Sequence, residues 1–386
     1  MNMIFFLRDK FFSFLFILFF LHGILYFVFP NLMFEDSWIK YIKYIIVYLA
    51  LVVFIKVNSF KEIILLFYVI FSLFMFVYLS HYRCFLDFND VVKRLLAYLT
   101  PLLVVLISSE MKKKIKEKYI NVIIYISIIV CFLEYFLFRN LILAFNFIES
   151  EGYYRSVSIF FNPNNAGIMF SFMIIYCINK LNEQKTRIKL ILVLLCLFAC
   201  VIFTSSKTPL VIIPMYYFIV YSFSVFKPML FTYNKFLIVI LSLFVLFGFL
   251  LMVLLFDFNS LFEVIPFRKI SVETGVIRFQ QIIDFINKLQ NNFLFPNYNL
   301  SLNETYDNAY IQLWSDFGFF GFIIYLGYLF YFIVKNGSVP IRKFAYYVVF
   351  LISGYSLNIF YIWPTTYVFW YVLSVSENKH NRYVQE

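Results

Sequence analysis

Long apolar runs separated by short polar stretches dominate the pattern of this chain. A helix needs about twenty apolar residues to cross about 30 Å of hydrocarbon, and these runs have helical length without strand-like alternation. They lie near positions 11–30, 42–55, 63–80, 95–109, 119–138, 165–179, 189–204, 209–226, 236–256, 309–334, 344–360 and 363–376. The pattern predicts an all-α, polytopic helical membrane protein with about twelve transmembrane helices.

The composition supports this prediction. Of the 386 residues, 63% are hydrophobic, 24% aromatic and 14% charged. A soluble core cannot bury so much apolar surface, so we expect residues 1–386 to form a single integral membrane domain. The run at 11–30 follows the basic residues Arg8 and Lys10 and leads to no small-residue cleavage site, so we expect a retained first span.

Charge indicates the orientation of the chain. The net charge of +11 would suggest nucleic acid for a soluble protein, but in a membrane protein the basic residues set topology, and no nucleic-acid partner is expected. With alternate loops on opposite sides, most Lys and Arg residues fall on the side of the N-terminus. Both termini are therefore expected in the cytoplasm. The two longest polar segments, 139–164 and 257–308, are expected outside, and the scattered cysteines and histidines predict neither disulfides nor a metal site.

The first outer segment, 139–164, carries Tyr153, Tyr154 and Arg155 and leads into a span through Asn162-Pro163-Asn164-Asn165. Proline between asparagines predicts a turn, and Asn165 is expected to cap the next helix. The planar guanidinium of Arg155 suits a phosphate group. The alternative is that Arg155 is an interfacial anchor whose charged end reaches water.

The second outer segment, 257–308, contains apolar residues at helical spacing between Val276 and Leu289. This spacing predicts an amphipathic helix at the outer membrane boundary. Projected at 100° per residue, Arg278 falls between the polar and apolar faces, where it could reach a lipid-borne headgroup. Ordinary interfacial anchoring is again the alternative.

The exit from this segment places polar residues at the start of a span. Asp307 is a good helix N-cap by type and position. Asn308, Gln312 and Asp316 follow at intervals of four and continue one polar face into the span. Polar groups at membrane depth need a protein partner or a watery cavity. Two weaker candidates are Lys207, in an outer turn, and Glu134, expected at the membrane interface.

Four segments together resemble the O-antigen polymerase and ligase superfamily: Arg155 to Gly167, Ser206-Lys207, Arg278, and Asp307 to Gly321. The resemblance covers roughly residues 150 to 335, with departures at Pro296, where glycine is usual, and at Lys207, where arginine is usual. It implies a fold similar to glycosyltransferases of the C type. It also implies a metal-independent transferase without cofactor in the bacterial inner membrane.

The resemblance implies polymerisation of undecaprenyl-pyrophosphate-linked oligosaccharide repeat units on the periplasmic face, as in lipopolysaccharide O-antigen biosynthesis. Ligases of the superfamily usually carry histidine at the position of Asp307, so the aspartate favours a Wzy-type polymerase. A ligase that transfers glycan to lipid A core remains an alternative. So do a polymerase of capsule or another surface polysaccharide and, further off, a flippase or transporter.

The expected site combines three catalytic residues with a binding set. Arg155 and Arg278 would stabilise the charge on the leaving pyrophosphate, and Asp307 would take the acceptor proton. Substrate binding is assigned to Asn308, Lys207, Asn164, Tyr306, Asp316 and Tyr154. The expected partners are the lipid-linked oligosaccharide, membrane lipid and a chain-length regulator in the same membrane.

Overall fold

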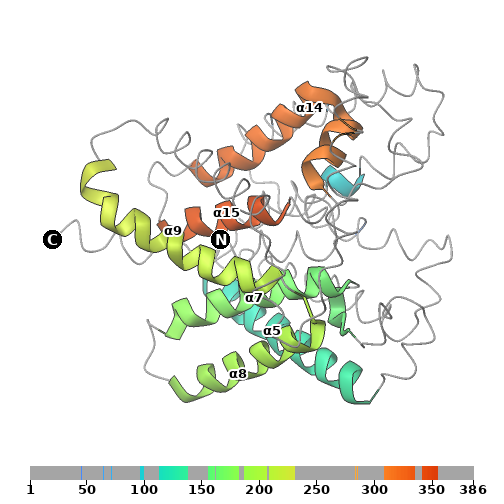
Figure 1. Ribbon diagram of the computed structural model, residues 1–386, viewed down its shortest axis with the longest axis vertical. Helices are drawn as coiled ribbons and strands as arrows, with labels where there is room; N and C mark the ends of the chain where they lie inside the picture. The colour runs from blue at the N-terminus through green and yellow to red at the C-terminus, as the bar shows by residue number, and fades with distance from the viewer. Residues whose placement is uncertain are drawn as a thin grey trace, which may run out of the picture.

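The computed structural model describes residues 45, 64, 71, 96–99, 113–137, 155–160, 162–181, 187–206, 208–230, 283, 285, 308–334 and 341–354. All regular structure in these ranges is helical (Figure 1). The helices are α5 (Lys113–Phe136), η3 (Ser158–Phe160), α7 (Pro163–Leu181), α8 (Arg187–Thr204), α9 (Thr208–Leu230), α14 (Ala309–Val334) and α15 (Ile341–Ser353). The all-α prediction is confirmed for this part of the chain, which contains no strand.

The helices follow the apolar runs of the sequence. The run at 309–334 has the same bounds as α14, and the runs at 119–138, 165–179, 189–204 and 209–226 correspond to α5, α7, α8 and α9. Two stretches, Glu117–Phe136 and Ala309–Tyr328, are long and apolar enough to cross a membrane. The expected spans at 11–30, 236–256 and 363–376 lie outside the described residues.

Asn162 caps the start of helix α7, three residues before the cap predicted from the sequence. The side-chain oxygen of Asn162 accepts a hydrogen bond from the Asn164 amide at 2.8 Å, and the Asn162 carbonyl accepts from the Ala166 amide at 2.9 Å. Pro163 suits the first helical position because its missing N–H has no partner there. The predicted cap at Asn165 is therefore wrong, since Asn165 lies buried inside the first turn.

Helix α7 is the core of the group formed with α8, α9 and α15 (Figure 1). Most of its side chains from Pro163 to Cys177 are buried, as expected for a helix that is apolar all round. Aromatic rings connect it to α15. The rings of Phe172 and Tyr346 lie 5.9 Å apart, and the Tyr346 hydroxyl donates to the Phe172 carbonyl at 3.3 Å. Tyr216 of α9 completes this cluster, with its ring 4.9 Å from that of Tyr346.

Helix α14 consists of two helical pieces that meet at Gly318. The φ of 68° and ψ of 179° at Gly318 are not helical, and glycine is the residue that adopts this conformation without a Cβ clash. The first piece is fastened to the end of α15. The Ala309 amide donates to the Gly354 carbonyl at 2.8 Å, and the Tyr310 hydroxyl donates to the Leu351 carbonyl at 2.6 Å. The start of α14 therefore lies beside the end of α15.

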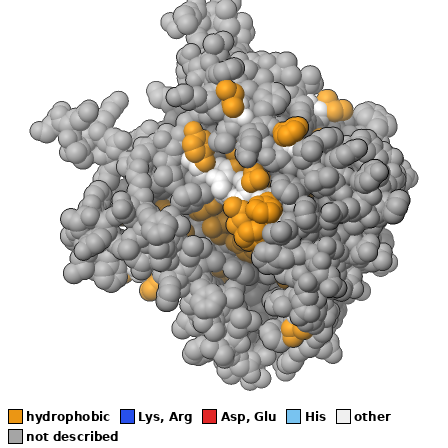
Figure 2. All heavy atoms as spheres, turned by 90° about the horizontal axis from the view of Figure 1, so that it is seen from above, with side chains coloured by type: hydrophobic (Ala, Val, Ile, Leu, Met, Phe, Trp, Pro, Cys, Tyr) orange, Lys and Arg blue, Asp and Glu red, His pale blue; other side chains and the backbone are white. Residues whose placement is uncertain are grey.

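The group presents apolar side chains on its outer surface as well. On α8 the exposed large hydrophobic residues recur every three or four positions and so form one face: Ile188, Ile191, Leu192, Leu195, Phe198 and Ile202. The opposite side of the same helix is apolar and buried, with Leu197 and Cys200 at 0% exposure. Figure 2 views the molecule from the α14 end, where hydrophobic side chains make up most of the described surface in sight.

Candidate functional site

Glu134, two residues before the end of α5, holds the segment that follows Arg155. Its side chain is fully buried, and its carboxylate accepts three hydrogen bonds. The donors are the Ser156 hydroxyl at 2.5 Å, the Val157 amide at 2.8 Å and the Ser158 amide at 2.6 Å. The Glu134 carboxylate thus turns into the protein to bind this segment, a contact that the sequence did not predict.

Two further hydrogen bonds, one to α8 and one to α5 itself, hold the same segment. The Ser156 amide donates to the Phe203 carbonyl of α8 at 2.9 Å, and the Ser158 hydroxyl donates to the Ser127 carbonyl of α5 at 2.9 Å. Ser158 has a φ of 50°, in the left-handed region that residues with a Cβ rarely adopt. Such a conformation persists where its surroundings over-determine it, and here the bonds to Glu134 and Ser127 do so.

The Arg155 guanidinium is fixed in two directions. Its Nε donates to the Thr204 carbonyl at 3.0 Å, and its Nη2 donates to the Asn164 side-chain oxygen at 2.8 Å. The acceptors belong to the end of α8 and the start of α7. A planar guanidinium bound at two of its nitrogens has a set orientation, which a free interfacial anchor lacks.

The start of α7 packs directly on the turn between α8 and α9. A Cβ added to Gly167 would lie 2.6 Å from the Ser206 Cβ and 3.2 Å from the Pro209 Cγ. Ser205 in this turn has a φ of 47°. Two of the four segments that carry the resemblance are thus brought together, since Gly167 of the first lies against Ser206 of the Ser206-Lys207 pair. Asn164 binds Arg155 within the first of these segments.

A second polar group lies at the start of α14. The Asn308 side-chain oxygen accepts from the Tyr310 amide at 2.9 Å and from the Ile311 amide at 3.3 Å. These bonds make Asn308 the N-cap of α14. The cap expected at Asp307 is therefore at the next residue instead.

Gln312 and Asp316 continue this polar face and are almost completely buried. The Gln312 amide nitrogen lies 3.1 Å from both carboxylate oxygens of Asp316, and the Tyr98 hydroxyl donates to one of them at 2.9 Å. Tyr98, in segment 96–99, is thus a protein partner of this polar face. Sequence reasoning missed Tyr98, because a single tyrosine in a run rich in aromatic residues carries no signal of its own.

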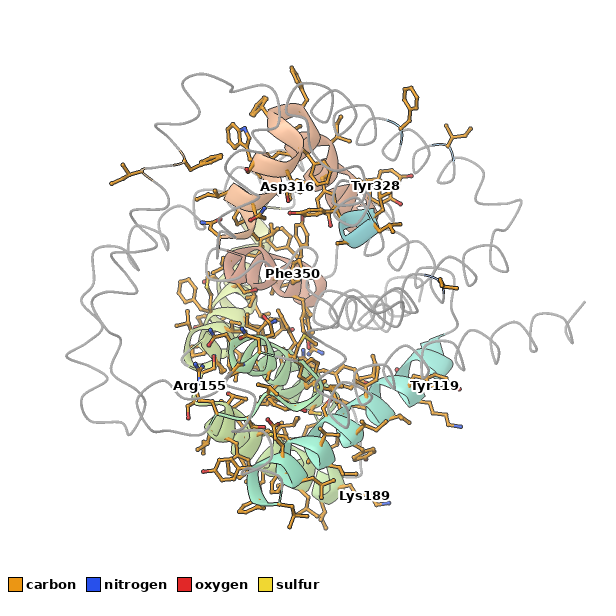
Figure 3. The ribbon with its side chains drawn as sticks, turned by 90° about the vertical axis from the view of Figure 1, so that its right-hand side faces the viewer. Tyr119, Arg155, Lys189, Asp316, Tyr328 and Phe350 are labelled. Atoms are coloured by element: carbon orange, nitrogen blue, oxygen red, sulfur yellow. The ribbon has the colours of Figure 1, made fainter. Side chains whose placement is uncertain are left out.

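The two groups lie apart in the molecule. Figure 3 labels Arg155 and Asp316 at different heights, with Phe350 of α15 between them, and Figure 1 shows α14, α15 and α7 in the same order along this axis. The structure therefore brings Arg155 together with Asn164. It places Asn308 and Asp316 on the same helix, α14, with Asn308 as its cap. Of the predicted site residues, the following lie outside the described part of the chain: Tyr154, Lys207, Arg278, Tyr306 and Asp307.

One contact concerns the predicted amphipathic helix between Val276 and Leu289. Two of its residues, Ile283 and Phe285, are described and helical. Phe285 is buried, and its ring lies 5.9 Å from that of Trp314 in the second turn of α14. Phe285 thus contacts α14 within two turns of Asn308.

Within the described residues, no three His, Cys, Asp or Glu side chains gather as a metal site. No protein-family model, curated protein or solved structure matches this chain.

Proposed function

We propose that this chain is a glycan polymerase of the bacterial inner membrane. It joins undecaprenyl-pyrophosphate-linked oligosaccharide repeat units on the periplasmic face. The observation that carries the proposal is the Arg155 guanidinium, oriented by Asn164 and Thr204 where two separate segments of the chain meet. A donor group held in advance stabilises developing charge most effectively, and a departing pyrophosphate develops negative charge.

The helices support a position in the membrane. Two stretches have the length and composition of a span, and α8 exposes an apolar face. A helix that is apolar on its buried and exposed sides suits lipid surroundings.

The helix ends support one functional side. In the topology expected from the sequence, α5, α8 and α15 end outside, and α7, α9 and α14 begin there. Gly167 packs on Ser206, and Ala309 binds Gly354, so each of these contacts joins ends assigned to the same side.

In the proposed reaction, a hydroxyl of a fresh lipid-linked repeat unit attacks the anomeric carbon of the growing glycan. The bond between this carbon and the pyrophosphate oxygen breaks, and undecaprenyl pyrophosphate leaves with the electron pair. Arg155 and Arg278 stabilise the charge on that leaving group. Asp307 accepts the proton of the attacking hydroxyl, and the transition state has oxocarbenium character, as in glycoside hydrolysis.

Two contacts support the contribution of the second outer segment. Asn308 caps α14, so capping is not needed to explain an aspartate at position 307. Phe285 packs on Trp314 near that cap. In a helix of 3.6 residues per turn, Arg278 precedes Phe285 by about two turns on nearly the same face. The proposal therefore expects Arg278 on the side that faces α14.

Complementation tests the function. The intact chain and its Arg155→Ala, Arg278→Ala and Asp307→Ala variants are expressed in a host that lacks its own polymerase and contains the matching lipid-linked repeat unit. Surface glycan is then resolved by gel. We expect a ladder from the intact chain and a single capped unit from each variant at equal expression. Arg342→Ala, which removes an exposed arginine at the start of α15, is the matched control and should keep the ladder.

Other outcomes would contradict the proposal in distinct ways. A ladder that forms on undecaprenyl pyrophosphate without this chain, but reaches lipid A core only with it, would make the chain a ligase. A ladder that survives all three substitutions would refute the site assignment. No ladder from the intact, well-expressed chain would refute the polymerase itself.

A further inference from the structure

Glu134 is the one fully buried acidic side chain in the described residues to which the proposed reaction gives no role. Its three donors, in Ser156, Val157 and Ser158, belong to consecutive residues. The two carboxylate oxygens can accept about four hydrogen bonds. One side chain thereby gathers a short stretch of backbone into a closed loop on the end of α5.

A buried carboxylate is an unusual means of attaching a loop. Burying a carboxyl group is unfavourable unless donors satisfy it, and an apolar side chain would attach the segment by packing alone. A carboxylate that binds two successive amides specifies backbone conformation as well as position. The left-handed φ of 50° at Ser158, whose amide binds Glu134, is the conformation that it specifies here.

This loop fixes the backbone of Arg155. Ser156, the next residue, is held from both sides, because its hydroxyl binds Glu134 of α5 and its amide binds Phe203 of α8. With this backbone held, the bonds of the Arg155 side chain to Thr204 and Asn164 orient the guanidinium. The position of the guanidinium thus depends on the ends of three helices, and Glu134 is the contribution of α5.

We propose that Glu134 is a positioning residue that fixes the Arg155 guanidinium for binding a pyrophosphate group. The identity of the ligand rests on the proposed function. The coupling of Glu134 to Arg155 rests on the contacts above. Loss of the carboxylate would release the loop and let the guanidinium turn away, even though Glu134 does not touch the ligand.

A double-mutant cycle tests this coupling. The full chain is purified in detergent, and its affinity is measured for farnesyl pyrophosphate, with farnesol as the uncharged control. Arg155→Ala and Glu134→Gln should each weaken binding about tenfold, the worth of one charge-assisted contact. The double variant should bind no more weakly than Arg155→Ala alone, because residues that act as one unit are not additive. Glu117→Gln, the same substitution at the other end of α5, is the matched control and should bind normally.

Two results would overturn the inference. The first is a double variant whose loss is the product of the two single losses, since Glu134 would then act independently of Arg155. The second is normal affinity in Glu134→Gln. If Glu134→Gln does not fold, as judged by gel filtration, Ser156→Ala removes one donor and enters the same cycle. It should lose about threefold in affinity, and nothing further when Arg155 is already alanine.

The experiment also separates this inference from the proposed function. An intact chain that binds farnesyl pyrophosphate through this coupled pair, but makes no ladder in the complementation host, leaves the inference standing and refutes the polymerase. An intact chain that binds farnesyl pyrophosphate no better than farnesol refutes the inference, whatever the ladder shows.

Discussion

Gly167 of α7 and Ser206 of the α8–α9 turn lie too close for a side chain at the first position: a Cβ on Gly167 would be 2.6 Å from the Ser206 Cβ. That atom is attached to backbone and cannot swing away, and the Pro209 ring closes the same space at 3.2 Å. The close approach keeps the start of α7 against the turn whose Thr204 carbonyl orients Arg155.

Gly167→Ala should destabilise the protein by about 1–3 kcal/mol, because the added methyl group overpacks this contact. Thermal unfolding in detergent should show a lower midpoint. Gly327→Ala is the matched control, since nothing lies within 4 Å of a Cβ there, and its midpoint should be unchanged or raised. Adding Ser206→Gly to Gly167→Ala should restore part of the loss. Equal midpoints for Gly167→Ala and Gly327→Ala would contradict the contact.

Arg155→Lys tests whether the guanidinium plane, beyond its charge, is needed. A lysine ammonium keeps the charge but cannot reproduce the pair of bonds to Thr204 and Asn164. We expect the rate of glycan transfer from a lipid-linked donor to fall about 10²-fold, as for loss of one preorganised donor. Arg342→Lys supplies the control. A rate within about twofold of the intact chain would mean that charge alone suffices at position 155, against the expectation from fork geometry.

The helices were predictable from the sequence because long apolar runs of helical length without strand-like alternation favour helices. The run at 309–334 has the bounds of α14 for that reason, and the polar residue Asn308 directly precedes it. The break at Gly318 was not predictable. Glycine is common in apolar runs, so the sequence predicts one continuous helix here. The structure instead breaks the helix at Gly318, where φ and ψ are not helical.

The site was predictable only as a set of segments. The sequence selected Arg155, Asn164 and the turn before Pro209, but the roles of Glu134 and Tyr98 depend on contacts that no local pattern encodes. Glu134 lies 22 residues from Ser156, and Tyr98 lies 218 residues from Asp316. The cap positions were missed by one residue at α14 and by three at α7. Several neighbouring asparagines and aspartates satisfy the same capping preference, and the sequence alone does not rank them.

Tyr98→Phe should destabilise the protein by about 1–3 kcal/mol, because it leaves one buried oxygen of Asp316 without its hydroxyl donor. Tyr217→Phe is the matched control. The Tyr217 hydroxyl is buried without a hydrogen-bond partner, so its removal should leave the unfolding midpoint unchanged or raise it. The comparison removes the same atom at both sites. If the two variants have the same midpoint, the bond from Tyr98 to Asp316 contributes nothing measurable to stability.

Asn308 and Asp307 should separate stability from activity. Asn308→Ala removes the cap of α14 and should lower the free energy of unfolding by about 1 kcal/mol, whereas Asn308→Asp keeps an acceptor for the Tyr310 and Ile311 amides and should cost little.

Asp307→Ala should leave the free energy of unfolding within about 0.5 kcal/mol of that of the intact chain, the usual range for a side chain that neither caps a helix nor fills a core. It should nevertheless abolish the glycan ladder. The two measurements must be made on the same preparations, because a ladder lost together with folded protein says nothing about chemistry. A large drop in midpoint for Asp307→Ala would give that carboxylate a structural role and remove the reason to regard it as the base.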